Sequence, residues 1–217
     1  MTEVIAFIGI GNMGSPMAEN LIKAKKKVRV FDISKEMIEK AKEKKFDVAN
    51  SIENLLSSAP KVVITMLPAG KHSKEVYLGE NGIINKVSKD CLLIDCSTID
   101  IKTSVEIGTK AKEKGIKMID APVSGGVMGA KNAALTFLVG GNQDAFDLAK
   151  PLLEIMGKNI FHAGELGCGN GAKICNNMAL GISMIGASEA LMLAKRLNID
   201  IKKVHEIMKN ASGNSWP

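Results

Sequence analysis

The sequence has 217 residues, of which 46% are hydrophobic and 24% are charged. These proportions are typical of a folded globular protein and exclude an extended disordered chain. The net charge is +6, but only Arg29 and Arg196 are arginines, and the lysines are mixed with glutamates in segments such as 35–45 and 110–117. Because such mixed charge is typical of a solvated surface, we expect no nucleic-acid partner.

The four cysteines show no metal-site signature. No Cys-x-x-Cys pair occurs and no histidine stands at zinc spacing from them. We therefore expect free thiols in a reducing compartment and no bound metal. The first expected strand begins at Val4, so we also expect no targeting segment here. Bacterial cytoplasm and, after loss of a transit peptide, the mitochondrial matrix both fit this pattern.

Short β-branched runs alternate with helical segments over the first three quarters of the sequence. The expected strands are Val4–Ile8, Val28–Phe31, Val62–Met66, Leu92–Asp95, Lys117–Ile119, Thr136–Gly140 and Asn159–Phe161. The expected helices are Met13–Ala24, Ser34–Lys44, Ile52–Ser57, Ser73–Leu78, Ile101–Lys114 and Asp144–Met156. The apolar strands lack a polar alternation, as in sheets covered by helices on both faces. This order predicts a Rossmann-type α/β fold with a doubly wound, mostly parallel sheet.

The pattern changes near Gly164. Residues 166–197 contain no strand signal and predict one helix of about 30 residues, roughly 45 Å long at 1.5 Å per residue. Asn176, Asn177 and Glu189 interrupt its most apolar part, which indicates a buried helix and not a membrane span. With a further helix over Ile201–Asn210, we expect two domains: a Rossmann domain over 1–163 and the start of an all-helical domain over 164–217.

The first strand runs into the glycine-rich turn Gly9-Ile10-Gly11-Asn12-Met13-Gly14. In such a turn Gly9 allows the tight bend, Gly11 lets the backbone approach a pyrophosphate, and Gly14 lets helix pack on strand. The amides and dipole of the following helix attract phosphates. Strand, turn and helix in this order predict a dinucleotide site that includes Asn12 and Met13.

Asp32 closes the second strand about 20 residues later, where an acidic residue accepts hydrogen bonds from the adenosine ribose. Its carboxylate would repel a 2′-phosphate, and no arginine follows it, so NAD is favoured; Lys35 leaves NADP open as the alternative. Ligands of such sheets bind beyond the carboxyl ends of the strands. The segments Met66-Leu67-Pro68 and Ser97-Thr98 therefore become candidate walls of the cofactor cleft, or else belong to ordinary turns.

A second candidate region is the segment Asp120–Gly126, at the end of a strand. Free amides at Gly125 and Gly126, together with the Ser124 hydroxyl, would form a cradle for a carboxylate. The alternative is a plain glycine loop.

A third candidate region is the glycine-rich segment 164–177. It places Lys173 and Asn177 one turn apart on the same helix face. A lysine that extends past a helix contact into solvent is the alternative here.

These motifs together resemble the β-hydroxyacid dehydrogenases, above all their 3-hydroxyisobutyrate dehydrogenase branch. The resemblance rests on the segments 7–14, 120–126, 173–177 and 182–190 and on Ala211-Ser212-Gly213 with Trp216. It implies Lys173 as the general acid/base, with Asn177 orienting the substrate and Ser124, Gly125 and Gly126 holding its carboxylate. It also implies a cofactor site made of Gly9, Gly11, Asn12, Met13, Gly14, Asp32, Leu67, Pro68 and Thr98.

The implied reaction is NAD-dependent oxidation of 3-hydroxyisobutyrate to methylmalonate semialdehyde in valine degradation. Reduction of tartronate or succinic semialdehyde is an alternative within the same class, and a non-catalytic dinucleotide-binding scaffold is one from another class. The family continues with further helices beyond the point that matches Pro217. The resemblance therefore implies a C-terminally truncated form whose long helix exposes apolar surface, and a homo-oligomer for the full-length form. We expect a small hydroxy acid as the partner and no membrane.

Overall fold

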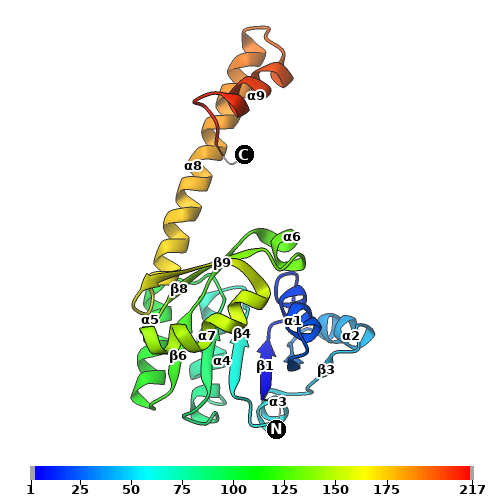
Figure 1. The fold of residues 1–217 in the computed structure, drawn as a ribbon, viewed down its shortest axis with the longest axis vertical. Coiled ribbons are helices and arrows are strands. Elements are labelled where there is room, and N and C mark those ends of the chain that lie inside the picture. The colour runs from blue at the N-terminus through cyan, green and yellow to red at the C-terminus, as the bar shows by residue number, and fades with distance from the viewer. Residues whose placement is uncertain (1–2, 216–217) are drawn as a thin grey trace. The chain divides into compact units, whose positions relative to one another are not determined.

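The computed structural model describes residues 3–215. The chain divides into two units, Met1–Lys173 and Ile174–Pro217. A single sheet runs through the first unit (Figure 1). Its strands are β1 Val4–Ile8, β2 Lys27–Phe31, β3 Asp47–Val48, β4 Val62–Thr65, β5 Leu92–Asp95, β6 Lys117–Asp120, β7 Val123–Ser124, β8 Leu135–Gly140 and β9 Gly157–Gly164. Its helices are α1 Gly14–Lys23, α2 Lys35–Glu43, α3 Ile52–Leu56, α4 Gly70–Leu78, the 3-10 turn Ile83–Asn85, α5 Ile101–Glu113, α6 Gly126–Lys131 and α7 Gln143–Met156.

The strand order is β3-β2-β1-β4-β5-β6-β8-β7, with β9 paired to β8. Pairs within the first six strands are parallel, whereas β8 runs antiparallel to β6 and β7. The order 3-2-1-4-5-6 is that of the dinucleotide-binding Rossmann fold. The expected doubly wound, mostly parallel sheet is therefore confirmed.

Successive residues of the central strands enter opposite cores, which explains why these strands show no polar alternation. In β1, Ile5 and Phe7 pack in the cluster that contains residues of α1 and α7, whereas Ala6 and Ile8 pack in the cluster that contains residues of α4 and α5. Helices thus cover both faces of the sheet. This arrangement leaves the carboxyl edge of the parallel strands as the place where loops can bind a ligand.

Several elements differ from the sequence-based expectation. The prediction missed β3, β7, α6 and the 3-10 turn, all of six residues or fewer, and it began α4 three residues late. The expected strand Asn159–Phe161 is too short, because β9 pairs with β8 over Gly157–Gly164. The long helix begins at Cys168 and not at Leu166, since Gly167 has a φ of +89°, outside the helical region.

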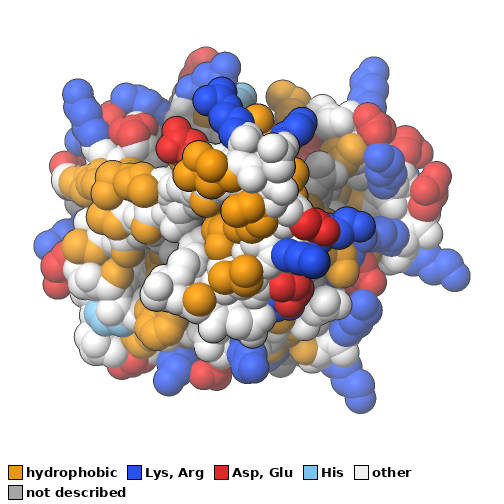
Figure 2. Space-filling view, turned by 90° about the horizontal axis from the view of Figure 1, so that it is seen from above, with side chains coloured by type: hydrophobic (Ala, Val, Ile, Leu, Met, Phe, Trp, Pro, Cys, Tyr) orange, Lys and Arg blue, Asp and Glu red, His pale blue; other side chains and the backbone are white. Residues whose placement is uncertain are grey.

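The second unit consists of most of the long helix α8, Cys168–Arg196, and of α9, Ile201–Asn210. The side chain of Asp200 caps α9 by accepting a hydrogen bond from the Lys202 amide. The expectation that the most apolar stretch, Ile174–Ala194, is buried is wrong for the described residues, because only 6% of the most apolar window of α8 is buried. The apolar surface that the resemblance implies for the long helix is instead exposed. α8 is long and apolar enough to cross a membrane by length and composition alone. Core helices of soluble proteins meet the same two criteria. Figure 2 shows hydrophobic side chains open to solvent between charged ones on one face of the molecule. Met178, Ile182 and Ile185 of α8 are exposed.

Candidate active site

A cavity of about 570 Å³ lies at the carboxyl ends of β1, β2 and β4. It brings together every predicted cofactor residue except Thr98. These lining residues are Gly9, Gly11, Asn12, Met13, Gly14, Asp32, Leu67 and Pro68. The glycine-rich turn and the acidic residue of β2 therefore face the same space, as a dinucleotide requires.

The turn after β1 tolerates side chains at only some of its positions. Gly9 has a φ of +90°, and a Cβ there would meet the carbonyl oxygen of Met66. A Cβ on Gly14 would meet the carbonyl oxygen of Gly9, so α1 can approach β1 only without a side chain here. Gly11 has open space where its Cβ would stand. That space is what a closely approaching ligand would fill.

The start of α1 is suited to an anion. Its N-cap residue Met13 provides no side-chain cap. In the first turn the Ser15 amide donates to the Gly11 carbonyl at 3.0 Å and Pro16 has no N–H, so the Gly14 amide is the first-turn donor left for a ligand. The Asp32 carboxylate accepts hydrogen bonds from the amides of Ile10 and Ser34, both at 2.8 Å, and so joins the end of β2 to the glycine turn. The donors and acceptors of the site therefore fit a dinucleotide: amides for the pyrophosphate and a carboxylate for the ribose.

The cavity also has lining residues that were not predicted, most of them apolar. Ile33 is 93% exposed directly after Asp32, an unusual exposure for an isoleucine next to a cleft. His72 was left out of the predicted site, yet it lines the cavity, and its buried Nδ1 has no hydrogen-bond partner within residues 3–215. Met66, a candidate wall from the sequence, also lines the cavity. The other unpredicted lining residues are Ile8, Phe31, Met37, Ile52, Glu75, Val76 and Asn81. Among these unpredicted residues, only Ile33 had a sequence signal, because it is an apolar residue directly after Asp32, the acidic residue expected to bind the ribose.

A buried polar chain supports the wall formed by Leu67. The Leu67 amide donates to Ser97 Oγ at 2.8 Å, and the Ser97 amide donates to Asp95 Oδ1 at 2.9 Å. The same Asp95 oxygen accepts from Thr65 Oγ1, which is also paired with the Tyr77 hydroxyl. Burial raises the pKa of Asp95. The loop after β4 is thus held by groups that water does not reach.

Lys173 lies in the first turns of α8 and is only 8% exposed. Burial lowers the pKa of its amine, because the protein interior disfavours the charged form. An amine of this kind can exchange a proton nearer to neutral pH than an exposed lysine can. This matches the requirement for an acid/base group.

The start of α8 is attached to the sheet by Asp120, the last residue of β6. The carboxylate is fully buried and accepts hydrogen bonds from the amides of Gly167 and Asn170, each at 2.7 Å. Burial raises the pKa of Asp120, and these hydrogen bonds oppose that rise. Lys173 is therefore carried by a helix whose first turn is held by the end of a core strand.

The segment Asp120–Gly126 is not the plain glycine loop that the sequence left open as an alternative. Val123 and Ser124 form β7 against β8, and Gly126 begins the six-residue helix α6. Local pairing with β8 produces the strand, and the positive φ angles of Gly125 and Gly126, +125° and +60°, turn the chain into the helix. Ser124 is half-buried and both glycines are exposed, so their amides remain open to a ligand.

Two predicted site residues, Thr98 and Asn177, lie outside the cavity and are exposed. Thr98 is exposed in the loop after β5 and does not line the cavity. Asn177 is exposed on α8, one turn beyond Lys173, and belongs to the second unit.

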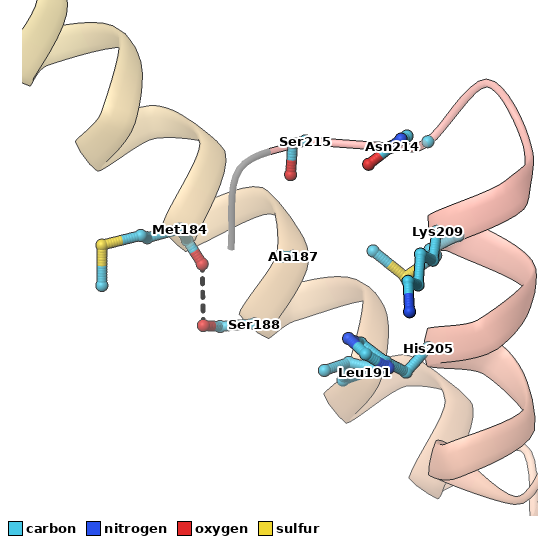
Figure 3. A pocket seen from close by; sticks show the side chains of 10 residues that line it. Met184, Ala187, Ser188, Leu191, His205, Lys209, Asn214 and Ser215 are labelled. Atoms are coloured by element: carbon cyan, nitrogen blue, oxygen red, sulfur yellow. Dashed lines mark hydrogen bonds between the residues drawn. The ribbon is translucent and has the colours of Figure 1, made fainter. Parts of the chain in front are cut away.

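The second unit has a pocket of its own between α8 and α9, of about 580 Å³. In this pocket the Ser188 hydroxyl donates to the Met184 carbonyl (Figure 3). It contains none of the predicted site residues.

Two family models match the chain. Residues 4–164 match the NAD-binding domain of 6-phosphogluconate dehydrogenase. Residues 167–217 match the model described as the NAD-binding domain of NADP-dependent 3-hydroxyisobutyrate dehydrogenase. The first match alone covers well over half of the chain, and it establishes that the cofactor is a nicotinamide dinucleotide, NAD.

Known relatives share both sequence and fold with the chain. A 3-hydroxyisobutyrate dehydrogenase from Pseudomonas aeruginosa is 48% identical, over the whole chain and 72% of that enzyme. An NAD-dependent L-serine dehydrogenase from the same organism is 43% identical, over 98% of the chain and 71% of the relative. The structure of 3-hydroxyisobutyrate dehydrogenase from Mycobacterium tuberculosis with L-serine superposes with a TM-score of 0.92 at 38% identity, covering 100% of this chain and 73% of that one.

Proposed function

Because the chain belongs to the 3-hydroxyisobutyrate dehydrogenase family of NAD-dependent oxidoreductases, we propose that it oxidises 3-hydroxyisobutyrate to methylmalonate semialdehyde, a step of valine degradation. The observation that carries the proposal is the buried Lys173 amine, whose pKa burial lowers. The cofactor, when bound, accepts the hydride from the carbon that bears the hydroxyl. The protein must supply a base for the hydroxyl proton.

In the oxidative direction, the neutral Lys173 amine takes the hydroxyl proton as the C–H bond breaks, and the carbon–oxygen bond becomes a carbonyl. In the reverse direction, the protonated amine polarises the carbonyl and returns the proton to the oxygen. Burial lowers the pKa of this amine, which makes its neutral form more accessible than that of an exposed lysine. The Ser124 hydroxyl and the amides of Gly125 and Gly126 would hold the carboxylate, and Asn177 would orient the substrate.

The order of the predicted residues along the sheet edge supports these roles. Asp32 follows β2, the glycine turn follows β1, and Leu67 with Pro68 follows β4. Thr98 follows β5, and Ser124 lies beyond β6. An elongated dinucleotide laid along this edge would place its ribose at Asp32, its pyrophosphate at the turn and its nicotinamide toward β5 and β6. Lys173 is held to the end of β6 through Asp120, at the reactive end of that path.

L-serine is the second candidate substrate, because a relative is named as an L-serine dehydrogenase and a similar structure contains L-serine. Both compounds are 3-hydroxy acids and differ at C2, which bears a methyl group in one and an ammonium group in the other. A carboxylate cradle and a base for the hydroxyl would serve either of them. The groups that face C2 decide between the two.

The test is NADH formation, followed by absorbance, with 3-hydroxyisobutyrate, L-serine and 3-hydroxypropionate as substrates and with NAD⁺ or NADP⁺. We expect turnover with NAD⁺, highest with 3-hydroxyisobutyrate, and a loss of about 10²- to 10⁴-fold in Lys173→Ala. Lys158→Ala, at an exposed lysine of β9, is the matched control and should leave the rate unchanged. Higher kcat/KM for L-serine would establish the second candidate. A Lys173→Ala variant as active as the control would refute the acid/base role.

A further inference from the structure

Asp120 and Asn170 form a buried clamp beneath Lys173. Asp120 Oδ1 accepts from the Gly167 amide, and Oδ2 accepts from the Asn170 amide at 2.7 Å and from Asn170 Nδ2 at 3.3 Å. Both side chains are fully buried. The amides at a helix start lack partners within the helix and carry partial positive charge. A carboxylate that accepts from them therefore holds the helix start more firmly than a neutral cap would.

The backbone around this carboxylate has room for it only because of glycines. A Cβ on Gly169 would lie 2.8 Å from Asp120 Oδ2, and a Cβ on Gly140 would meet Asp120 Oδ1. Gly167 donates its amide from a backbone with a φ of +89°, a conformation that other residues rarely adopt. Gly140 of β8, Gly167 directly before α8 and Gly169 in its first turn thus fit around one side chain. A role limited to filling the core would not need this arrangement.

Asn170 extends the clamp to a second loop. Its Oδ1 accepts the Ile99 amide at 2.9 Å, in the loop that carries Thr98, while its Nδ2 donates to Asp120. A single amide side chain therefore joins the loop after β5, the end of β6 and the start of α8. Lys173 follows three residues later, about 4.5 Å farther along the helix axis.

We infer that Asp120 and Asn170 are positioning residues that fix the Lys173 amine relative to the loops bearing Thr98 and Ser124. The inference rests on the proposed acid/base role of Lys173. The pair acts through the helix backbone and not as a counter-ion, because a carboxylate facing the amine would favour its charged form. Burial is instead what acts on Lys173, and it lowers the pKa of the amine.

The first test needs neither substrate nor cofactor. Competitive acetylation with acetic anhydride over pH 6–11, with mass spectrometry of the Lys173 peptide, gives the pH midpoint of this amine's reactivity. In Asn170→Ala, we expect the midpoint to move to higher pH, because the released helix start lets water reach the amine. Asn159→Ala, which removes an exposed asparagine bond to Thr136, is the matched control and should not move it. An unchanged midpoint in a folded Asn170→Ala protein would overturn the inference.

The second test uses the reaction. Asn170→Ala should lower kcat by about 10- to 100-fold, as misplacement by about 1 Å does, with KM for NAD⁺ unchanged. The rise of kcat with pH should shift in the alkaline direction together with the acetylation midpoint. Mere loss of folded protein would scale kcat equally at every pH, and that result would overturn the inference.

A third measurement keeps the inference testable if Asn170→Ala does not fold. Hydrogen exchange of the wild-type chain should show the Ile99 and Gly167 amides protected as strongly as those of β5, and rapid exchange at either would contradict the clamp. Wild-type protein that turns over no hydroxy acid but passes the exchange and acetylation tests would refute the proposed function and leave the clamp in place.

Discussion

Replacing Asp32 by asparagine tests the cofactor preference. The wild-type carboxylate accepts the amides of Ile10 and Ser34, and it is the group expected to accept the ribose hydroxyls. Asparagine has nearly the same size, but its NH₂ group replaces one acceptor oxygen and would face the amide N–H of Ile10 or Ser34. Two donors that face each other form no hydrogen bond. A hydrogen bond to a charged group contributes about 1.5–3 kcal/mol, so NADH should bind about 10- to 100-fold more weakly.

NADPH should respond in the opposite direction. Two unit charges 4 Å apart interact by about 4 kcal/mol at an effective dielectric constant of 20, and salt reduces this. Removal of the Asp32 charge therefore relieves a repulsion of the 2′-phosphate, and the preference for NADH over NADPH should fall by about 100-fold or more. Calorimetric titration with both cofactors measures this ratio, with the exposed Asp144→Asn as the control. Equal affinities of the wild-type protein for NADH and NADPH would refute the reasoning.

Three further predictions concern two glycines of the turn after β1 and the buried carboxyl of β5. Gly14→Ala should lower the free energy of unfolding by about 1–3 kcal/mol or more in urea titrations, because its methyl group meets the Gly9 carbonyl oxygen. Gly11→Ala, with open space at that position, should keep the stability and weaken only NADH binding, measured by fluorescence. Because burial raises the pKa of Asp95, the stability that this carboxyl contributes is full below the ordinary aspartate pKa and is lost as pH rises through its folded value. Asp95→Asn should therefore gain on the wild type in urea titrations between pH 4 and pH 8, and a constant difference between the two proteins would count against a charged, buried Asp95.

The parallel part of the fold could be predicted because its signals are local. Strands such as Val4–Ile8 are apolar on both faces, and glycine turns and caps mark where the helices begin. The missed elements depend on tertiary pairing. β3 has two residues that pair with β2, and β7 has two that pair with β8. Neither is long enough to show a period of its own.

The candidate site likewise contains residues with a local sequence signal and residues whose role depends on tertiary contacts. The turn after β1 and Asp32 have fixed spacing, so the sequence alone indicated them, and the cavity joins them. Asp120 and Asn170 are 50 residues apart, and neither carries a motif for its role. The sequence signal that could have drawn attention to Asp120 is an acidic residue at the end of an apolar strand. Burial of its charge requires partners from elsewhere in the chain.

The placement of Lys173 follows from the first unit alone. Its helix starts against Asp120, and Asn170 binds the loop after β5, all within Met1–Lys173. Asn177, proposed to orient the substrate, belongs to the second unit. The acid/base role and one of the proposed substrate contacts are thus assigned to different parts of one helix. Substitutions in 174–217 should therefore change KM and the choice among 3-hydroxy acids more than the pH at which Lys173 loses its proton.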